Sequence, residues 1–338
     1  MTNLFKRAAV FTDLHVGLKS NSVQHNEDCW NYIQWFVDTA KKNDCETVIM
    51  TGDWHNHRAS INVMSLNYSL RCLEHLSKNF ERVFLIPGNH DLFYRDRRDV
   101  SSVEWAKHLP NLVIVNDFIT EGGVTFCPWL VGDDARRLKR IDSQYVFGHF
   151  EFPLFLMNSF VEMPQHGDFD ASWVAGAGHV FSGHFHKRQT RGNVTYLGNA
   201  FPHNFSDAGD DDRGMMILSW GEAPVYHAWP DQPLYRVHNL SKVLDDPERL
   251  LLPNSHVRIN LDIPVSYEEA NFIREELMPK YRLREVSLIP SKQNLEDDQT
   301  NYENTTFESV DAIIQSQIAE LQDGAFDKQL LLQIYQNL

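Results

Sequence analysis

Five short apolar runs in this chain each lead into side chains that can bind a cation, and this recurrence limits the fold more than any other feature. The length and composition of the runs predict buried strands. Segments with helical spacing separate the early runs, and the resulting β-α-β-α-β order predicts an α/β fold. The runs and the polar residues after them are Ala8–Phe11 before Asp13 and His15, Thr47–Met50 before Asp53, Val83–Pro87 before Asn89 and His90, Tyr145–Phe147 before His149, and His179–Phe181 before His184 and His186.

The side chains at these strand ends are oxygen and imidazole donors without a thiolate. In Asp13–His15 and His184–His186 the two donors are two residues apart, so both members of a pair can face one cavity of an extended chain. Each motif alone is weak evidence for a metal site, because a lone Asp after a strand is more often a helix cap. A chance origin for all five is improbable. The pattern therefore predicts a metal centre that suits Mn, Fe or Zn, with no clear choice between them.

The length predicts one large domain with a smaller part, or two domains, and the cysteine usage fits a reducing compartment. The chain has 338 residues, 42% of them hydrophobic, and its four cysteines form no CxxC pair. Isolated cysteines argue against a disulfide scaffold or a thiolate zinc site. The N-terminal segment lacks a signal-peptide pattern, and no apolar run is long enough to cross a bilayer. We therefore expect a cytoplasmic protein.

The net charge of −15 disfavours a nucleic-acid partner at first, but its distribution weakens that objection. Residues 1–200 are nearly neutral, and residues 201–338 carry most of the excess of Asp and Glu. Two basic clusters lie in the neutral part, at 95–98 and at 136–140. Either cluster alone is more simply a solvated surface loop, although bound divalent cations would add positive charge nearby.

The ordered motifs D-x-H, G-D, G-N-H-D, G-H and G-H-x-H resemble those of the calcineurin-like metallophosphoesterase family over roughly residues 7–200. The resemblance implies a four-layer, double-sheet α/β sandwich flanked by helices, with two divalent metals at one end. Mn is the expected metal, and Mg, Fe and Zn are the alternatives. It also implies a role for each motif residue: one metal bound by Asp13, His15 and His186, the other by Asn89, His149 and His184, Asp53 bridging both, His90 acting on the scissile phosphate, and Asp91 orienting His90 or the loop.

Within that family the chain is more similar to SbcD-type nuclease subunits of break-repair complexes, and especially to those of phages, than to protein phosphatases. The phosphatases extend the second motif to GDxxDRG, whereas here it reads GDWHNH from Gly52. The stretches VFGHFEFPLF and VTYLGNAFPHNFSD support the nuclease branch. This resemblance implies DNA contacts, and a location in the host cytoplasm if a phage encodes the chain. The expected DNA contacts are Asn56, Arg95, Arg97, Arg98, His203 and Ser206.

Asn56 departs from the nuclease branch, which commonly has His or Asp at that position. Its role in placing DNA is therefore altered or taken over by a flanking histidine. We assign neither His55 nor His57 as a metal ligand, since each is more simply a loop residue.

The chain is expected to divide into a nuclease domain at 1–230, a β-α-β capping domain at 231–290, a polar linker at 291–306 and a helical tail at 307–338. The linker lacks a core stripe, and the tail has apolar residues at helical spacing. The resemblance implies that the tail binds the coiled coil of an SbcC-type ATPase, with docking on this chain as the alternative. Apolar residues on more than one face of 60–76 predict a helix that needs a second partner. The resemblance implies that this partner is a second copy in a symmetric homodimer, with a helix covered by its own chain as the alternative.

Three functions are compatible with the sequence. The first is a metal-dependent DNA nuclease that cuts duplex ends as an exonuclease and single strands as an endonuclease. The second is a phosphodiesterase for a cyclic or small nucleotide, and the third is a non-catalytic DNA-end-binding subunit. A complete set of expected ligands disfavours the third, and the additional C-terminal segments disfavour the second.

Overall fold

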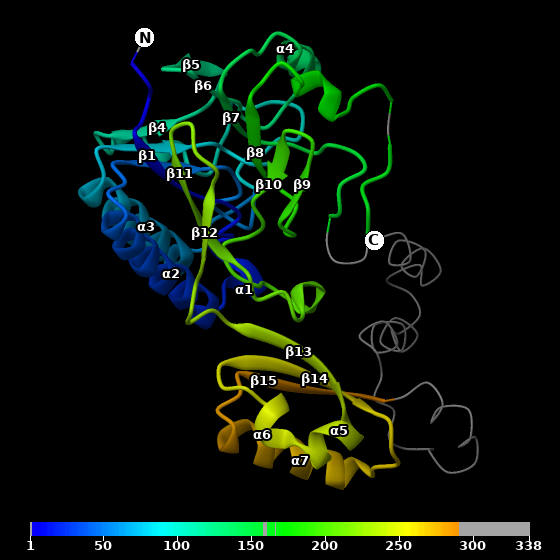
Figure 1. Cartoon of the computed structure of the whole chain (residues 1–338). Helices are drawn as coiled ribbons and strands as arrows, with labels where there is room; N and C mark the ends of the chain where they lie inside the picture. The colour runs from blue at the N-terminus through cyan, green and yellow to red at the C-terminus, as the bar shows by residue number, and fades with distance from the viewer. Residues whose placement is uncertain (1, 158–160, 166, 291–338) are drawn as a thin grey trace, which may run out of the picture. The chain divides into compact units, whose positions relative to one another are not determined.

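The predicted strands lie in two six-stranded sheets within residues 2–157, 161–165 and 167–290, which the computed structural model describes (Figure 1). The first sheet has the order β12-β11-β1-β2-β3-β4. Strands β1 to β4 are parallel, β11 is antiparallel to β1, and β12 is antiparallel to β11. Their bounds are β1 Arg7–Phe11, β2 Thr47–Met50, β3 Arg82–Leu85, β4 Leu112–Ile114, β11 Gly214–Ser219 and β12 Val225–Ala228.

The second sheet has the order β5-β6-β7-β8-β10-β9. Strands β6, β7, β8 and β10 are parallel, and the edge strands β5 and β9 are antiparallel to their neighbours. Their bounds are β5 Ile119–Glu121, β6 Val124–Phe126, β7 Tyr145–His149, β8 His179–Gly183, β9 Gln189–Arg191 and β10 Val194–Tyr196.

Side chains alternate between the two faces of each strand, and this explains how the first sheet contributes to two hydrophobic cores. Val10 of β1 lies in the core between the two sheets, whereas Phe11 lies in the core beneath the helices. Between the sheets, Phe84 stacks on Phe126 with 4.2 Å between ring centroids. Successive strand side chains point to opposite faces, so each central strand packs against the other sheet on one face and against helices on the other. The predicted mixed α/β fold, with two sheets flanked by helices, is confirmed.

Helices cover the outer faces of both sheets. The long helices α2 Val23–Lys42 and α3 Val63–Asn79 pack on the first sheet, where the sequence spacing predicts helices. Ser22 and Asn62 cap them by accepting hydrogen bonds from backbone N–H groups of the first turn. The short helix α4 Ala135–Leu138 and a 3₁₀ turn at Ala171–Val174 cover the second sheet, and α1 Leu18–Asn21 precedes α2.

The segment after β12 forms a third, three-stranded sheet with a core of its own. Its strands are β13 Leu234–Asn239, β14 Ser255–Leu261 and β15 Glu285–Pro290, and its helices are α5 Leu240–Asp245, α6 Pro247–Leu250 and α7 Tyr267–Lys280. The sequence predicts β14, α7 and β15. It does not single out β13, because that strand has intermediate or exposed residues on both faces and lacks a clean apolar alternation.

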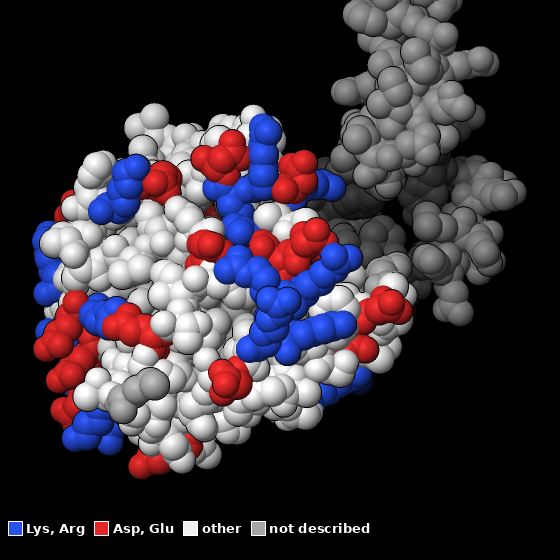
Figure 2. Space-filling view, turned by 90° about the horizontal axis from the view of Figure 1, so that it is seen from above, with Lys and Arg blue, Asp and Glu red and all other residues white. Residues whose placement is uncertain are grey.

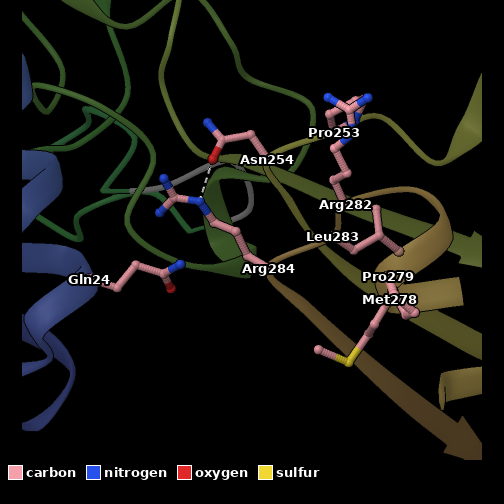
Figure 3. Close-up of a pocket in the computed structure, with 8 residues that line it drawn as sticks. All are labelled: Gln24, Pro253, Asn254, Met278, Pro279, Arg282, Leu283 and Arg284. Atoms are coloured by element: carbon pink, nitrogen blue, oxygen red, sulfur yellow. Dashed lines mark hydrogen bonds between the residues drawn. The ribbon is translucent and has the colours of Figure 1, made fainter.

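Arg284 connects this third sheet to helix α2. Its guanidinium donates to both carboxylate oxygens of Asp28, at 2.5 and 2.7 Å. Its Nε donates to Asn254 Oδ1 at 2.5 Å (Figure 3). A planar guanidinium binds a carboxylate in this two-point manner with high directional preference. The cavity beside this contact has a volume of about 780 Å³ and is lined by Gln24, Pro253, Asn254, Met278, Pro279, Arg282, Leu283 and Arg284. It contains none of the strand-end Asp and His side chains.

The expected linker at 291–306 and tail at 307–338 lie outside the described residues. Among the helices that are described, none combines the length and the apolar character needed to cross a bilayer.

Candidate metal centre

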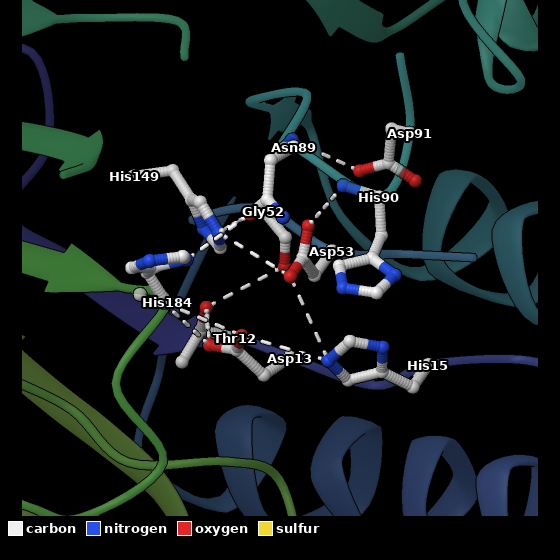
Figure 4. Close-up of polar contacts among 12 residues, drawn as sticks. Thr12, Asp13, His15, Gly52, Asp53, Asn89, His90, Asp91, His149 and His184 are labelled. Carbon is white, nitrogen blue, oxygen red and sulfur yellow. Dashed lines mark hydrogen bonds and ion pairs between the residues drawn. The ribbon is translucent and has the colours of Figure 1, made fainter. Parts of the chain in front are cut away.

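The side chains at the strand ends converge at one edge of the two sheets (Figure 4). Parallel strands of both sheets end there, so residues far apart in the sequence meet. Within the described residues, three groups have one donor atom per residue within 4.8 Å of the others. The groups are Asp13 with His15 and Asp53, Asp53 with His149 and His184, and His15 with His186 and His203.

Asp53 lies between the two sides of this cluster. Its Oδ1 accepts a hydrogen bond from the His90 backbone N–H at 2.9 Å. Its Oδ2 lies 3.3 Å from His149 Nε2 and 3.6 Å from His15 Nε2. Asp53 is only 2% exposed and belongs to two of the three donor groups. This is the position that a carboxylate shared by two cations would need.

Two histidines of the cluster are oriented by acceptors on the far side of their rings. His149 Nδ1 is 2.7 Å from the Thr51 carbonyl oxygen, so the Nδ1–H donates there, and Nε2 faces Asn89 Oδ1 at 3.1 Å. His184 Nε2 is 3.4 Å from Glu151 Oε1, and its Nδ1 lies 3.0 Å from Asn89 Oδ1. A carbonyl or carboxylate behind an imidazole fixes the tautomer that a metal requires. The sequence analysis did not identify Thr51 or Glu151.

His15 shows most directly that the cluster fits a cation. Both of its ring nitrogens are buried and have no hydrogen-bond partner among the described residues. Its Nε2 lies 3.8 Å from Asp13 Oδ1 and 3.6 Å from Asp53 Oδ2. Buried polar atoms in proteins almost always have a partner. A divalent cation would bind the imidazole nitrogen and neutralise the carboxylates, and the mixed oxygen and imidazole donors suit Mn, Fe or Zn.

The electrostatics of the cluster also favour bound positive charge. Burial raises the pKa of Asp53, but His149 and then His15 outweigh that effect and hold this pKa well below its ordinary value. Burial lowers the pKa of His149, yet the neighbouring Asp53 raises it to about 9. The buried carboxylates therefore attract positive charge, whether it is carried by protons or by a metal ion.

Unusual backbone conformations coincide with the cluster. Asp13, His15, Asp53 and His184 all have positive φ, at 51°, 52°, 57° and 89°. Side chains other than glycine rarely adopt this region, and such strain tends to concentrate at functional sites. Gly52 has a φ of 110°. The space around it also requires glycine, because a Cβ there would lie 2.0 Å from His149 Nδ1.

His90 lies beside the donors and is partly exposed. Its ring centroid is 5.0 Å from that of His15, and its Nδ1 is 2.7 Å from the Asn56 carbonyl oxygen. The Nδ1–H therefore donates to Asn56, which leaves Nε2 free to face a substrate. The backbone of Asn56, and not its side chain, orients His90.

Asp91 is completely buried and holds two loops together. Its carboxylate accepts hydrogen bonds from the backbone N–H groups of His55, Gly88 and Trp54, at 2.9, 3.0 and 3.1 Å. Burial, followed by the charge of Asp53, raises the pKa of Asp91 to about 6. Of the two roles that the sequence left open, these contacts favour positioning the loop over orienting the His90 ring.

Asp91→Ala is expected to destabilise the fold by about 3–5 kcal/mol, because three buried N–H groups would lose their acceptor at about 1–3 kcal/mol each. Denaturant unfolding measures this free energy. Asp96→Ala, at an exposed position of the following loop, is the matched control and should change stability by less than about 0.5 kcal/mol. Equal stability of the two variants would contradict the loop-holding role.

The expected DNA contacts differ in how accessible they are. Arg95 and Arg97 are exposed, although Arg97 pairs with Asp99 at 3.1 Å. Arg98 is largely buried, because its guanidinium donates to the carbonyl oxygens of Asn116 and Trp129 and to the carboxylate of Asp134. The face that carries α4 shows Lys and Arg gathered among Asp and Glu (Figure 2). Ion pairs therefore offset much of this positive charge.

Of two further expected DNA contacts, Ser206 and His203, only His203 belongs to a donor group. Ser206 is half-buried and donates its hydroxyl hydrogen to Asn204 Oδ1 at 2.6 Å. His203 is only 2% exposed and lies in the third donor group, so its ring offers almost no surface to DNA. Burial lowers the pKa of His203 well below its ordinary value.

His55 is buried as well. Its ring nitrogens lie 2.9 Å from the hydroxyls of Ser69 and Ser102, away from the donors.

Comparisons with known proteins agree with the geometry of the cluster. Residues 6–188 match the model of the calcineurin-like phosphoesterase family. Exonuclease subunit 1 of Enterobacteria phage T4 is 25% identical over 215 residues, which are 61% of this chain and 62% of that protein. The chain thus matches less than two thirds of the length of this relative.

Two solved structures are similar to parts of this chain. Nuclease MPE of Pseudomonas putida is 19% identical, with a TM-score of 0.30, over 56% of this chain and 66% of that one. A dimetal phosphatase from Danio rerio is 12% identical, with a TM-score of 0.42, over 62% of this chain and 91% of that one.

Proposed function

Because this chain belongs to the calcineurin-like phosphoesterase family, we propose that it is a metal-dependent nuclease that hydrolyses DNA phosphodiesters, as an exonuclease on duplex ends and an endonuclease on single strands. The observation that carries the proposal is the convergence of Asp13, His15, Asp53, Asn89, His149, His184 and His186 beside His90. The similarity to a phage exonuclease subunit supports a nucleic acid over other phosphodiesters as the substrate.

The residues have distinct tasks in this proposal. Asp13, His15 and His186 would hold one divalent cation, Asn89, His149 and His184 would hold the other, and Asp53 would be shared by both. The cations, when bound, supply Lewis acidity toward the phosphodiester and toward the attacking water. His90 faces the phosphate through Nε2, because its Nδ1–H is engaged by the Asn56 carbonyl. A protonated His90 can then donate from Nε2 to the transition state or to the leaving oxygen.

The direct test is hydrolysis by the purified chain with Mn²⁺ as the probe metal. We expect cleavage of linear duplex DNA and of a chromogenic phosphodiester, and loss of both activities with a chelator. Cleavage of a cyclic nucleotide but not DNA would favour the small-nucleotide phosphodiesterase. DNA binding without hydrolysis of any phosphodiester would favour a non-catalytic end-binding subunit.

A symmetric homodimer through α3 is part of the proposal. Val63 and Leu70 are seven residues apart on this helix, and their exposed fractions are 83% and 37%. Apolar side chains on an outer helix face favour a partner surface. Light scattering at micromolar concentration should therefore give twice the chain mass, and Leu70→Glu should give the monomer. Leu244→Glu, which changes an exposed leucine of α5, should leave the dimer intact. A monomeric wild-type chain would refute the dimer.

We also propose that residues 307–338 bind a coiled-coil ATPase of the SbcC type. The support comes from the sequence, in which apolar residues recur at helical spacing after a polar linker. Deleting 307–338 should leave metal-dependent cleavage unchanged and abolish co-purification with the ATPase. A chain in which 291–306 are replaced by a flexible linker of equal length should retain the ATPase. Undiminished association of the deleted chain would refute this assignment.

A further inference from the structure

His203 lies in the segment after β10, and its buried imidazole has no role in the proposed mechanism. Its side chain is 2% exposed, and its Nε2 has no hydrogen-bond partner among the described residues. An imidazole nitrogen buried in this way loses its contact with water without compensation. The position of the ring therefore requires a ligand or another source of stabilisation.

The ring of His203 completes a triangle of imidazoles. Its centroid is 5.3 Å from that of His15 and 5.5 Å from that of His186, and the two latter rings are 5.4 Å apart. The three rings meet edge to face, at interplanar angles from 65° to 89°. One ring nitrogen from each lies within 4.8 Å of the other two. Three imidazoles around one point are a known ligand set for catalytic zinc.

The surroundings of His203 fix the ring in this position. The His203 backbone N–H donates to Asp207 Oδ2 at 2.9 Å, and its carbonyl oxygen accepts from the Tyr235 hydroxyl at 2.8 Å. The same Asp207 oxygen accepts from Asn199 Nδ2 at 3.2 Å. Phe201 packs edge to face against the ring, with 5.2 Å between centroids. Supporting contacts of this kind orient metal ligands and lower the entropic loss on binding.

We propose that His203 is a further ligand of the metal position assigned to Asp13, His15 and His186, and that it makes this position rich in imidazole. The inference rests on the two-metal centre of the proposed function. Imidazole suits Zn and Fe, whereas Mn and Mg prefer oxygen ligands. His203 therefore biases this position toward Zn²⁺ or Fe²⁺. Among the described residues, no third histidine joins His149 and His184 at the other position.

Metal binding in the absence of DNA tests the proposal separately from nuclease activity. The probes are Zn²⁺, Mn²⁺ and Co²⁺ added to the metal-free full-length chain. His203→Gln should weaken Zn²⁺ binding at one of two positions by at least about 10-fold and change Mn²⁺ binding less. In the Co²⁺ form, His203→Gln should remove one hyperfine-shifted imidazole N–H signal from the proton NMR spectrum.

His227→Gln is the matched control. His227 of β12 is a half-buried histidine whose Nε2 also lacks a partner among the described residues, but it belongs to no donor group. It should keep the Zn²⁺ affinity and the Co²⁺ spectrum of the wild type. Unfolding curves for both variants, and the second variant His203→Asn, separate loss of a ligand from loss of the fold. Zn²⁺ affinity and a Co²⁺ spectrum unchanged in folded His203→Gln would overturn the assignment, even if the wild type cleaves DNA. Their loss in His203→Gln would support it, even if the wild type cleaves no DNA.

Discussion

Asp53→Ala is expected to remove both metal binding and hydrolysis, the largest effect of any single substitution in this chain. Asp53 Oδ2 faces His149 and His15 from the two sides of the cluster, at 3.3 and 3.6 Å. Without it, the donors on either side lose the carboxylate that they share. We expect turnover on DNA to fall by at least about 1000-fold, or about 4 kcal/mol in the activation free energy.

Metal content after gel filtration and single-turnover hydrolysis measure the two losses. Asp53 has a φ of 57°, so alanine also adds backbone strain there. Asp44→Ala controls for that strain, because Asp44 has a φ of 54° while its side chain is 90% exposed and far from any donor group. Asparagine can adopt the same backbone conformation, so Asp53→Asn removes only the charge of the side chain. Retention of two metals by Asp53→Asn would contradict the bridging role.

Much of the fold is predictable because the two sheets are built from local signals. Runs such as Thr47–Met50 are apolar on both faces, as buried parallel strands must be, and they end at glycine or polar residues. Helix α2 follows from the period of its apolar positions. Strand β13 is missed because its burial alternates weakly, and only pairing with β14 makes it a strand. Pairing of this kind depends on tertiary context, which a local pattern does not contain.

The cluster of donors is predictable for a related reason. Each parallel strand presents its carboxyl end at one edge, so Asp53 and Asn89 must come near each other once the strands pair. The supporting contacts are not predictable in this way. The acceptor behind His149 is the carbonyl of Thr51, and backbone atoms carry no residue-type signal. The resemblance implies that His203 contacts DNA, and its burial is not predictable because an isolated histidine has no periodicity that reveals burial.

His90→Ala is expected to slow DNA hydrolysis by about 100- to 10,000-fold while leaving metal content unchanged, since the role expected for its ring is proton donation and not metal binding. The geometry makes the role specific. The Nδ1–H of His90 is directed to the Asn56 carbonyl oxygen at 2.7 Å, so Nε2 can donate only when the imidazole is protonated. Burial lowers the pKa of His90, and the nearby Asp53 only partly offsets this effect.

Two substrates distinguish how His90 acts. A nitrophenyl phosphodiester has a leaving group that needs little protonation, whereas the DNA leaving oxygen is strongly basic. If His90 protonates the leaving oxygen, His90→Ala should lose at least about 10-fold more activity on DNA than on the nitrophenyl substrate. If it stabilises charge on the phosphate, both rates should fall equally. His108→Ala, an exposed histidine outside every donor group, should change neither rate. Cleavage of DNA by His90→Ala at nearly the wild-type rate would remove His90 from the mechanism, because the reaction would then proceed without an imidazole at this position.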